Sequence, residues 1–146
     1  MFSRIFTLAL LMLALSGCAK PPYNNLDNEQ LQSMLEQGTP IYDILRPEEW
    51  HQTGVIADSQ LMTFVDAGGR ILPDFMQRFT SAVGKDDPVV LICRTGNRTS
   101  TLARHLVEHM GYTQVYNVRD GITRWIRDGR SVTRLQTVQP RDGDTA

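Results

Sequence analysis

The sequence predicts an α/β fold in which helices cover both faces of a parallel β-sheet. Short apolar runs of strand length alternate along the chain with longer segments that have one apolar face, a pattern typical of parallel sheets. Residues 88–92 read PVVLI, and this continuous apolar run indicates a strand buried on both faces. The ligand site of such a sheet is expected at the carboxyl ends of its strands.

The first half of the predicted domain begins with a helix that Asp27 caps. Gln30 stands three residues later, so the two residues form a capping-box pattern, and residues 31, 34 and 35 supply the apolar face. Residues 38–40 should end this helix. The segments expected next are a strand at 41–45, a short helix from Pro47, a strand at 55–57 and a loop at 58–72.

The second half alternates more regularly. Thr99 or Ser100 is expected to cap the helix that follows the buried strand, and Gly111 should end it. Trp125 should anchor the last helix. The predicted segments are a helix at 73–83, a turn at 85–88, the strand at 88–92, a helix at 99–110, a strand at 115–118, a helix at 122–127 and a closing stretch at 130–135.

Length and charge limit the possible functions. The 146 residues suffice for one domain, and 41% of them are hydrophobic. The net charge of -1 does not indicate nucleic-acid binding, which requires a strongly basic face. His105 and His109 stand four residues apart with no third ligand in the pattern, so we predict neither a metal site nor a cofactor.

The N-terminus is typical of a targeting segment. Arg4 precedes an apolar run at 5–15, which is too short to span a membrane because a spanning helix needs roughly 20 residues. The following LSGC, residues 15–18, resembles the lipobox of bacterial lipoproteins, which implies lipidation at Cys18. An ordinary secretory signal is the alternative. With Ala19 after the cysteine, the resemblance implies a periplasm-facing protein anchored in the outer membrane.

The expected organisation therefore has four parts: a signal peptide at 1–17, a lipidated anchor and tether at 18–25, a folded domain at 26–135 and a polar tail at 136–146. An exported chain with two cysteines would ordinarily form a disulfide. If Cys18 is lipidated, Cys93 has no partner within the chain, and an unpaired thiol in an oxidising compartment must be shielded or used.

The segment CRTGNRT, residues 93–99, joins the buried strand to a helix and contains the expected chemistry. There the Cys93 sulfur would face unpaired amide groups and the positive end of the helix dipole, which favours the thiolate. Arg94 and Arg98 add positive potential, and Gly96 permits a positive φ. The alternative is a buried, inert cysteine. The expected binding loop consists of Arg94, Thr95, Gly96, Asn97, Arg98 and Thr99.

This loop resembles the active loop of the rhodanese family: Cys, two variable residues, Gly, one variable residue, Arg, then Ser or Thr. Two further segments are similar to the family's first and closing motifs, namely DILRPEEW at 43–50 and NVRDGITRW at 117–125. The resemblance covers roughly residues 26–135. It implies a three-layer α/β/α sandwich with about five parallel strands, and sulfurtransferase activity at Cys93.

Three positions depart from the family pattern. Leu45 stands where the family usually has Arg, with Arg46 one place later, and Val55 stands where it often has His. Asp120 replaces the first residue of a glycine pair. Asp43 is expected to be a structural residue near the site.

The expected reaction moves a sulfane sulfur from a small anionic donor such as thiosulfate, through a Cys93 persulfide, to a thiol or cyanide. A protein partner is not indicated by the sequence. A cysteine phosphatase or arsenate reductase would have five residues between Cys and Arg, whereas four separate Cys93 from Arg98, which disfavours those activities. A non-catalytic, lipid-anchored sulfur carrier or sensor remains the alternative.

Overall fold

The structure, a computed structural model, describes residues 19–136. The predicted signal peptide, Cys18 and all but the first residue of the predicted tail lie outside these residues. The described chain contains five strands and five helices in the order β1 (Asn24–Leu26), α2 (Asn28–Glu36), β2 (Ile41–Asp43), α3 (Pro47–Thr53), β3 (Gln60–Leu61), α4 (Phe75–Ala82), β4 (Val89–Ile92), α5 (Asn97–Met110), β5 (Val115–Val118) and α6 (Gly121–Arg127).

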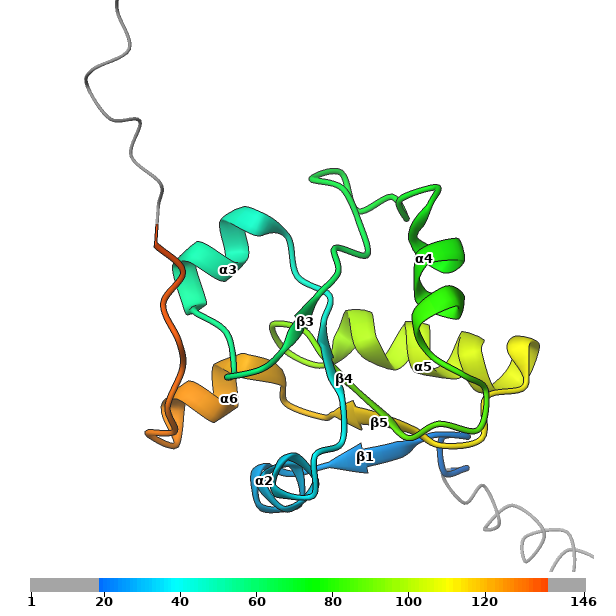
Figure 1. Cartoon of the computed structure of the whole chain (residues 1–146), viewed down its shortest axis with the longest axis horizontal. Coiled ribbons are helices and arrows are strands. Elements are labelled where there is room, and N and C mark those ends of the chain that lie inside the picture. Colours follow the sequence, from blue (N-terminus) through cyan, green and yellow to red (C-terminus); the bar gives the residue numbers. More distant parts are fainter. Residues whose placement is uncertain (1–18, 137–146) are drawn as a thin grey trace, which may run out of the picture.

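The five strands form one sheet in the order β1-β5-β4-β2-β3, and every neighbouring pair is parallel. Figure 1 shows α4 and α5 on one side of this sheet and α2 and α6 on the other. The chain crosses from β1 to β2 in one direction along the sheet and returns from β3 through β4 to β5 in the other, and right-handed connections that run in opposite directions place their helices on opposite faces. The predicted three-layer α/β/α fold is confirmed.

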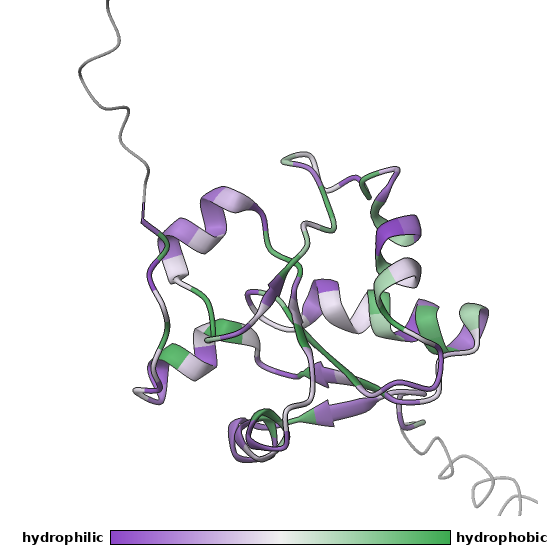
Figure 2. Ribbon diagram, in the orientation of Figure 1, coloured by the Kyte–Doolittle hydropathy of each residue, from purple (hydrophilic) through white to green (hydrophobic). Residues whose placement is uncertain are grey.

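Strand β4 lies in the middle of the sheet and determines where the core forms. All four of its side chains are buried, and Figure 2 shows the strand as hydrophobic along its length. Aromatic side chains from α4 pack beside it, where the Phe79 ring meets those of Phe75, Tyr42 and Tyr112 at centroid distances of 5.5 to 5.9 Å. A central strand has no face that water reaches, so only apolar residues stabilise it.

Several predicted elements are wrong in place or extent. Strand β1 begins at Asn24, within the segment expected to be tether. The strand expected at 55–57 is absent from the sheet, where Val55 forms only an isolated antiparallel bridge with Thr133. Strand β3 lies instead in the segment expected to be a loop. Both β1 and β3 are two- or three-residue edge strands, too short for any hydrophobic period to be visible.

Helix α5 also differs from the prediction. It begins at Asn97 with Gly96 as N-cap, so neither Thr99 nor Ser100 caps it. Gly96 has φ of 86° and no side chain, so no side-chain cap is present at the start of this helix. Helix α2, in contrast, has the predicted capping box between Asp27 and Gln30.

Candidate active site

Cys93 directly follows the last residue of β4, and four residues later α5 is already helical. The cysteine is buried, with 1% of its surface exposed. Its Sγ atom lies 3.3 Å from Oγ1 of Thr99, and the same hydroxyl lies 3.1 Å from the Gly96 carbonyl oxygen. A hydroxyl has one hydrogen to donate. Thr99 can therefore donate to Gly96 while the sulfur is a thiol, or to the sulfur when it is an anion.

The loop that Cys93 begins lies against the connection between β5 and α6. The backbone N–H groups of Ile122 and Thr123 donate to the carbonyl oxygens of Cys93 and Arg94, at 2.9 and 3.1 Å. In a trans peptide the C=O and the N–H point in opposite directions. The amides of Arg94 and Thr95 therefore point away from α6.

Two glycines make this close approach possible. A Cβ atom at Gly96 would collide with the Arg119 carbonyl, and one at Gly121 would collide with the Arg94 carbonyl. Both glycines have positive φ, at 86° and 62°. Gly121 is the second residue of the altered glycine pair in the closing motif. The Asp120 that replaces the first therefore leaves the packing contact intact.

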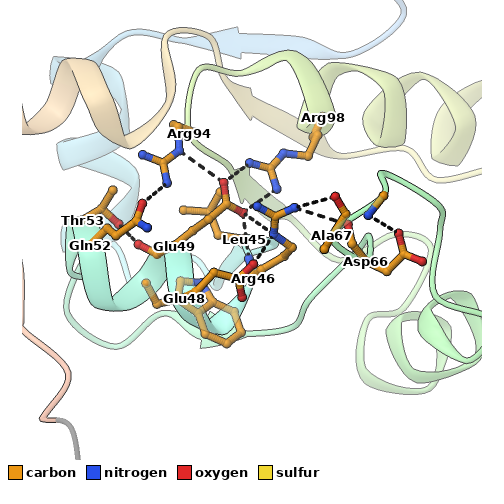
Figure 3. Close-up of polar contacts among 12 residues, drawn as sticks. Leu45, Arg46, Glu48, Glu49, Gln52, Thr53, Asp66, Ala67, Arg94 and Arg98 are labelled. Atoms are coloured by element: carbon orange, nitrogen blue, oxygen red, sulfur yellow. Dashed lines mark hydrogen bonds and ion pairs between the residues drawn. The ribbon is translucent and has the colours of Figure 1, made fainter.

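The two arginines of the loop both bind Glu49, which lies in α3 (Figure 3). Arg98 donates through both terminal nitrogens to the two carboxylate oxygens, at 2.7 and 2.8 Å. Arg94 donates through Nε at 3.2 Å to one of these oxygens and through Nη2 to Gln52 at 3.0 Å. The Glu49 side chain is 6% exposed. We did not predict Glu49 from the sequence, although a Glu beside Trp50 in the first motif was a possible signal.

Glu49 is ionised despite its burial. Burial by itself raises the pKa of Glu49, but hydrogen bonds from Arg98 and the Arg46 amide, together with the Arg98 charge, lower it to about 2. Hydrogen bonding to Glu49 in turn raises the pKa of Arg98. A fixed ion pair therefore stands beside the Cys93 loop at neutral pH, and it offsets part of the positive potential expected from the arginines alone.

Arg46 adds a third guanidinium to this cluster. Its Nε lies 2.6 Å from Glu48 and 3.5 Å from Glu49, and Nη1 donates to the carbonyls of Asp66 and Ala67 at 3.4 Å. Arg46, one position after Leu45, therefore supplies a guanidinium group at the first motif. Leu45, in contrast, is fully buried in the core.

Asp43 lies at the end of β2, in register with Ile92, the residue before Cys93. Its Oδ1 accepts hydrogen bonds from the Leu45 amide at 3.0 Å and the Trp50 indole at 2.8 Å. Oδ2 is buried without a partner among the described residues. Burial raises the pKa of Asp43 to about 6, against the opposing effect of these two hydrogen bonds. Asp43 thus ties α3 to the sheet beside the loop.

Beyond the loop lies an open cavity of about 230 Å³. Thr95 lines it from the loop side and α6 from the other. The remaining lining residues are Asp120, Thr123, Arg124 and Arg127. Asn97 is exposed, and its carbonyl accepts a hydrogen bond from the Ser100 hydroxyl at 2.8 Å.

Within residues 19–136, no three His, Cys, Asp or Glu side chains cluster as metal ligands would. In the same part of the chain, no helix has both the length and the apolar character needed to cross a membrane.

Comparison with known proteins places this site in context. The sequence model of the rhodanese-like domain matches residues 27–128. A sulfurtransferase of Allochromatium vinosum is 32% identical over 73% of this chain and 91% of its own length. The thiosulfate sulfurtransferase GlpE of Pseudomonas syringae is 28% identical over 80% of this chain and 96% of its own.

Solved structures agree on the fold. The polysulfide-sulfur transferase homodimer of Wolinella succinogenes superposes with a TM-score of 0.63 at 17% identity, covering 94% of each chain. The rhodanese-like domain of the Alr3790 protein from Anabaena gives 0.61 at 19% identity, covering 88% of this chain and 92% of that one. At these identities the likeness establishes the architecture alone.

Proposed function

Because this chain belongs to the rhodanese-like domain family, we propose that it is a sulfurtransferase in which Cys93 carries a sulfane sulfur as a persulfide. The observation that supports this most directly is the position of Cys93, directly after the central strand β4 and four residues before the first residue of α5. Relatives named as sulfurtransferases add support.

The first step attaches sulfur to the enzyme. The Cys93 thiolate attacks the outer sulfur of a donor such as thiosulfate, a new S–S bond forms, and the donor's S–S bond breaks to release sulfite. The terminal sulfur of the persulfide keeps the negative charge. The amides of Arg94 and Thr95, which point away from α6, and the Thr99 hydroxyl are the groups that would stabilise this anion.

The second step regenerates the thiolate. A thiolate or cyanide attacks the terminal sulfur, forming a new bond to it while the bond to Cys93 breaks. No cofactor is needed, because each step is a displacement at sulfur by an activated nucleophile.

The experiment is mass spectrometry of the intact protein after incubation with thiosulfate. We expect a gain of one sulfur atom, its loss on addition of cyanide with release of thiocyanate, and neither change in Cys93→Ser. A folded Cys93→Ser variant that still produced thiocyanate would refute the assignment.

A sulfur carrier or sensor is the second candidate, and two observations favour it. Cys93 is nearly inaccessible, and both loop arginines are already bound to Glu49. A persulfide from which cyanide and thiols remove the sulfur only over hours would support the carrier function. Repeated turnover would support the sulfurtransferase function.

We further propose that residues 1–17 form a cleaved signal peptide and that Cys18 is lipidated, which would place the domain in the periplasm on the outer membrane. The support is the order of Arg4, the apolar run and LSGC in the sequence. Metabolic labelling with a fatty acid should mark the wild-type chain but not Cys18→Ser. A labelled Cys18→Ser chain would contradict the anchor.

A further inference from the structure

We infer that Glu49 determines which donor charge the site prefers. With Glu49 in place, the site favours singly charged sulfane donors, such as thiosulfonates, over doubly charged thiosulfate. This inference rests on the proposed sulfurtransferase function and specifies its substrate class. Glu49 is a positioning residue in this scheme, because it acts on the donor through Arg94 and Arg98.

The hydrogen bonds leave the loop arginines little freedom to meet a donor. Arg98 uses both terminal nitrogens on Glu49, and Arg94 uses Nε on Glu49 and Nη2 on Gln52 (Figure 3). Bidentate guanidinium–carboxylate pairs are among the strongest in proteins. A donor anion must therefore either displace Glu49 from the arginines or be attracted by the positive charge that Glu49 leaves uncompensated.

Displacement of Glu49 is unfavourable. Its carboxylate is held from four directions, by the guanidinium groups of Arg46, Arg94 and Arg98 and by the Arg46 backbone amide at 3.0 Å. The adjacent Trp50 is hydrogen-bonded to Asp43, which keeps α3 in place. Removing one partner from a buried pair is costly because it leaves an uncompensated charge.

The positive electrostatic potential that remains at the cluster is small. Three arginines in the cluster pair with two glutamates, Glu48 and Glu49, so one positive charge is in excess among the paired side chains, and the nearby Asp43 opposes it further. Without Glu49 the excess would double. The second negative charge of thiosulfate would gain little from the present cluster, while its desolvation would still cost free energy. A donor with one charge avoids that cost.

Thiosulfate and methanethiosulfonate form a matched pair of probes. Both present an outer sulfur on a tetrahedral sulfur, and a methyl group in the second replaces one charged oxygen of the first. Methanethiosulfonate reacts by the same displacement: the Cys93 thiolate takes the outer sulfur as the persulfide, and methanesulfinate leaves with the electron pair of the broken bond.

The test is the ratio of kcat/KM for thiosulfate to kcat/KM for methanethiosulfonate, with cyanide as acceptor. We expect Glu49→Gln to raise this ratio roughly fivefold, since one unit of charge a few ångströms away has at least about that effect on a neighbouring charge even in a water-like dielectric. Glu48→Gln is the matched control, because the Glu48 side chain is 54% exposed, pairs with Arg46 and contacts neither loop arginine, so solvent screens its charge from the donor. It should change the ratio less than about twofold.

An unchanged ratio in a folded Glu49→Gln variant would overturn the inference, as would an equal rise in both variants. A general loss of loop structure would lower kcat/KM for both donors by the same factor and leave their ratio constant.

A second measurement needs neither turnover nor a variant. Sulfate and methanesulfonate differ by the same single charge, and each should slow alkylation of wild-type Cys93 by iodoacetamide when it occupies the site. We expect methanesulfonate to protect at an equal or lower concentration than sulfate. Protection by sulfate at a tenfold lower concentration would refute the charge preference. Failure of both donors to form a persulfide would instead refute the proposed function.

Discussion

At the scale of single residues, the shape of the Cys93 loop depends on backbone contacts that leave no room for a side chain. Gly96 lies against the carbonyl of Arg119, and Gly121 lies against that of Arg94. The first turn of α6 provides the amides, those of Ile122 and Thr123, to which the loop carbonyls point. The direction in which the loop amides point thus depends on the packing of the loop against α6 as well as on the start of α5.

Gly96→Ala should therefore destabilise the protein and abolish persulfide formation. The positive φ of 86° costs about 1 kcal/mol for Ala, and the collision with Arg119 adds on the order of 2 kcal/mol or more. Gly129→Ala is the control, because Gly129 has φ of 74° with no atom near its Cβ position. Urea denaturation and mass spectrometry after thiosulfate would measure both effects. Equal losses of stability in the two variants would show that the collision is relieved.

At the scale of elements, sequence patterns predicted those helices and strands whose signals are local. The capping box of α2 lies within four residues, and β4 is a continuous apolar run. Strands β1 and β3 were missed, because edge strands of two or three residues are fixed by their neighbours. Asn24 and Asn25 join the sheet by pairing with Tyr116 and Asn117 of β5.

Asp27→Ala tests the capping box. Asp27 Oδ1 accepts from the Gln30 amide at 2.8 Å, and Gln30 returns a bond to the Asp27 amide at 3.0 Å. Its loss should cost about 1 kcal/mol of unfolding free energy. Persulfide formation should be unchanged, because both hydrogen bonds of the capping box lie within residues 27–30 and neither involves the Cys93 loop. Asp27→Asn, which keeps the acceptor oxygen, should retain most of the stability. A loss of persulfide formation in Asp27→Ala, measured at a temperature where the variant is folded, would contradict the expectation that the capping box affects stability alone.

At the scale of the whole molecule, the candidate site is assembled from segments that the sequence leaves far apart. Glu49 meets Arg94 and Arg98 across 45 and 49 residues. The Cys93 loop could be predicted because its residues are contiguous and its start coincides with a strand end. The ion pairs could not, because the order β1-β5-β4-β2-β3 decides that α3 lies beside that loop.

Two buried carboxyl groups give the molecule opposing responses to pH. The pKa of Glu49 is lowered to about 2, so its stabilising effect is present above its unfolded value of 4.5 and is lost as the pH falls toward 2. The pKa of Asp43 is raised to about 6, so its contribution is fully present below its unfolded value of 3.8 and is lost as the pH rises through 6. The combined contribution of these two groups is therefore greatest near pH 4.

Asp43→Asn should remove the second of these responses. Asn keeps an acceptor for the Leu45 amide and the Trp50 indole but cannot ionise, so it resembles the protonated carboxyl. Relative to this variant, the wild type should lose up to about 3 kcal/mol of unfolding free energy between about pH 4 and pH 7.5. Asp74→Asn changes an exposed side chain at the N-cap of α4, and its unfolding free energy should stay within about 0.5 kcal/mol of the wild-type value at both pH values. Urea denaturation at the two pH values measures the difference. If the gap between wild type and Asp43→Asn were the same at both, Asp43 would have to be ionised throughout this range, with its burial compensated by Arg98.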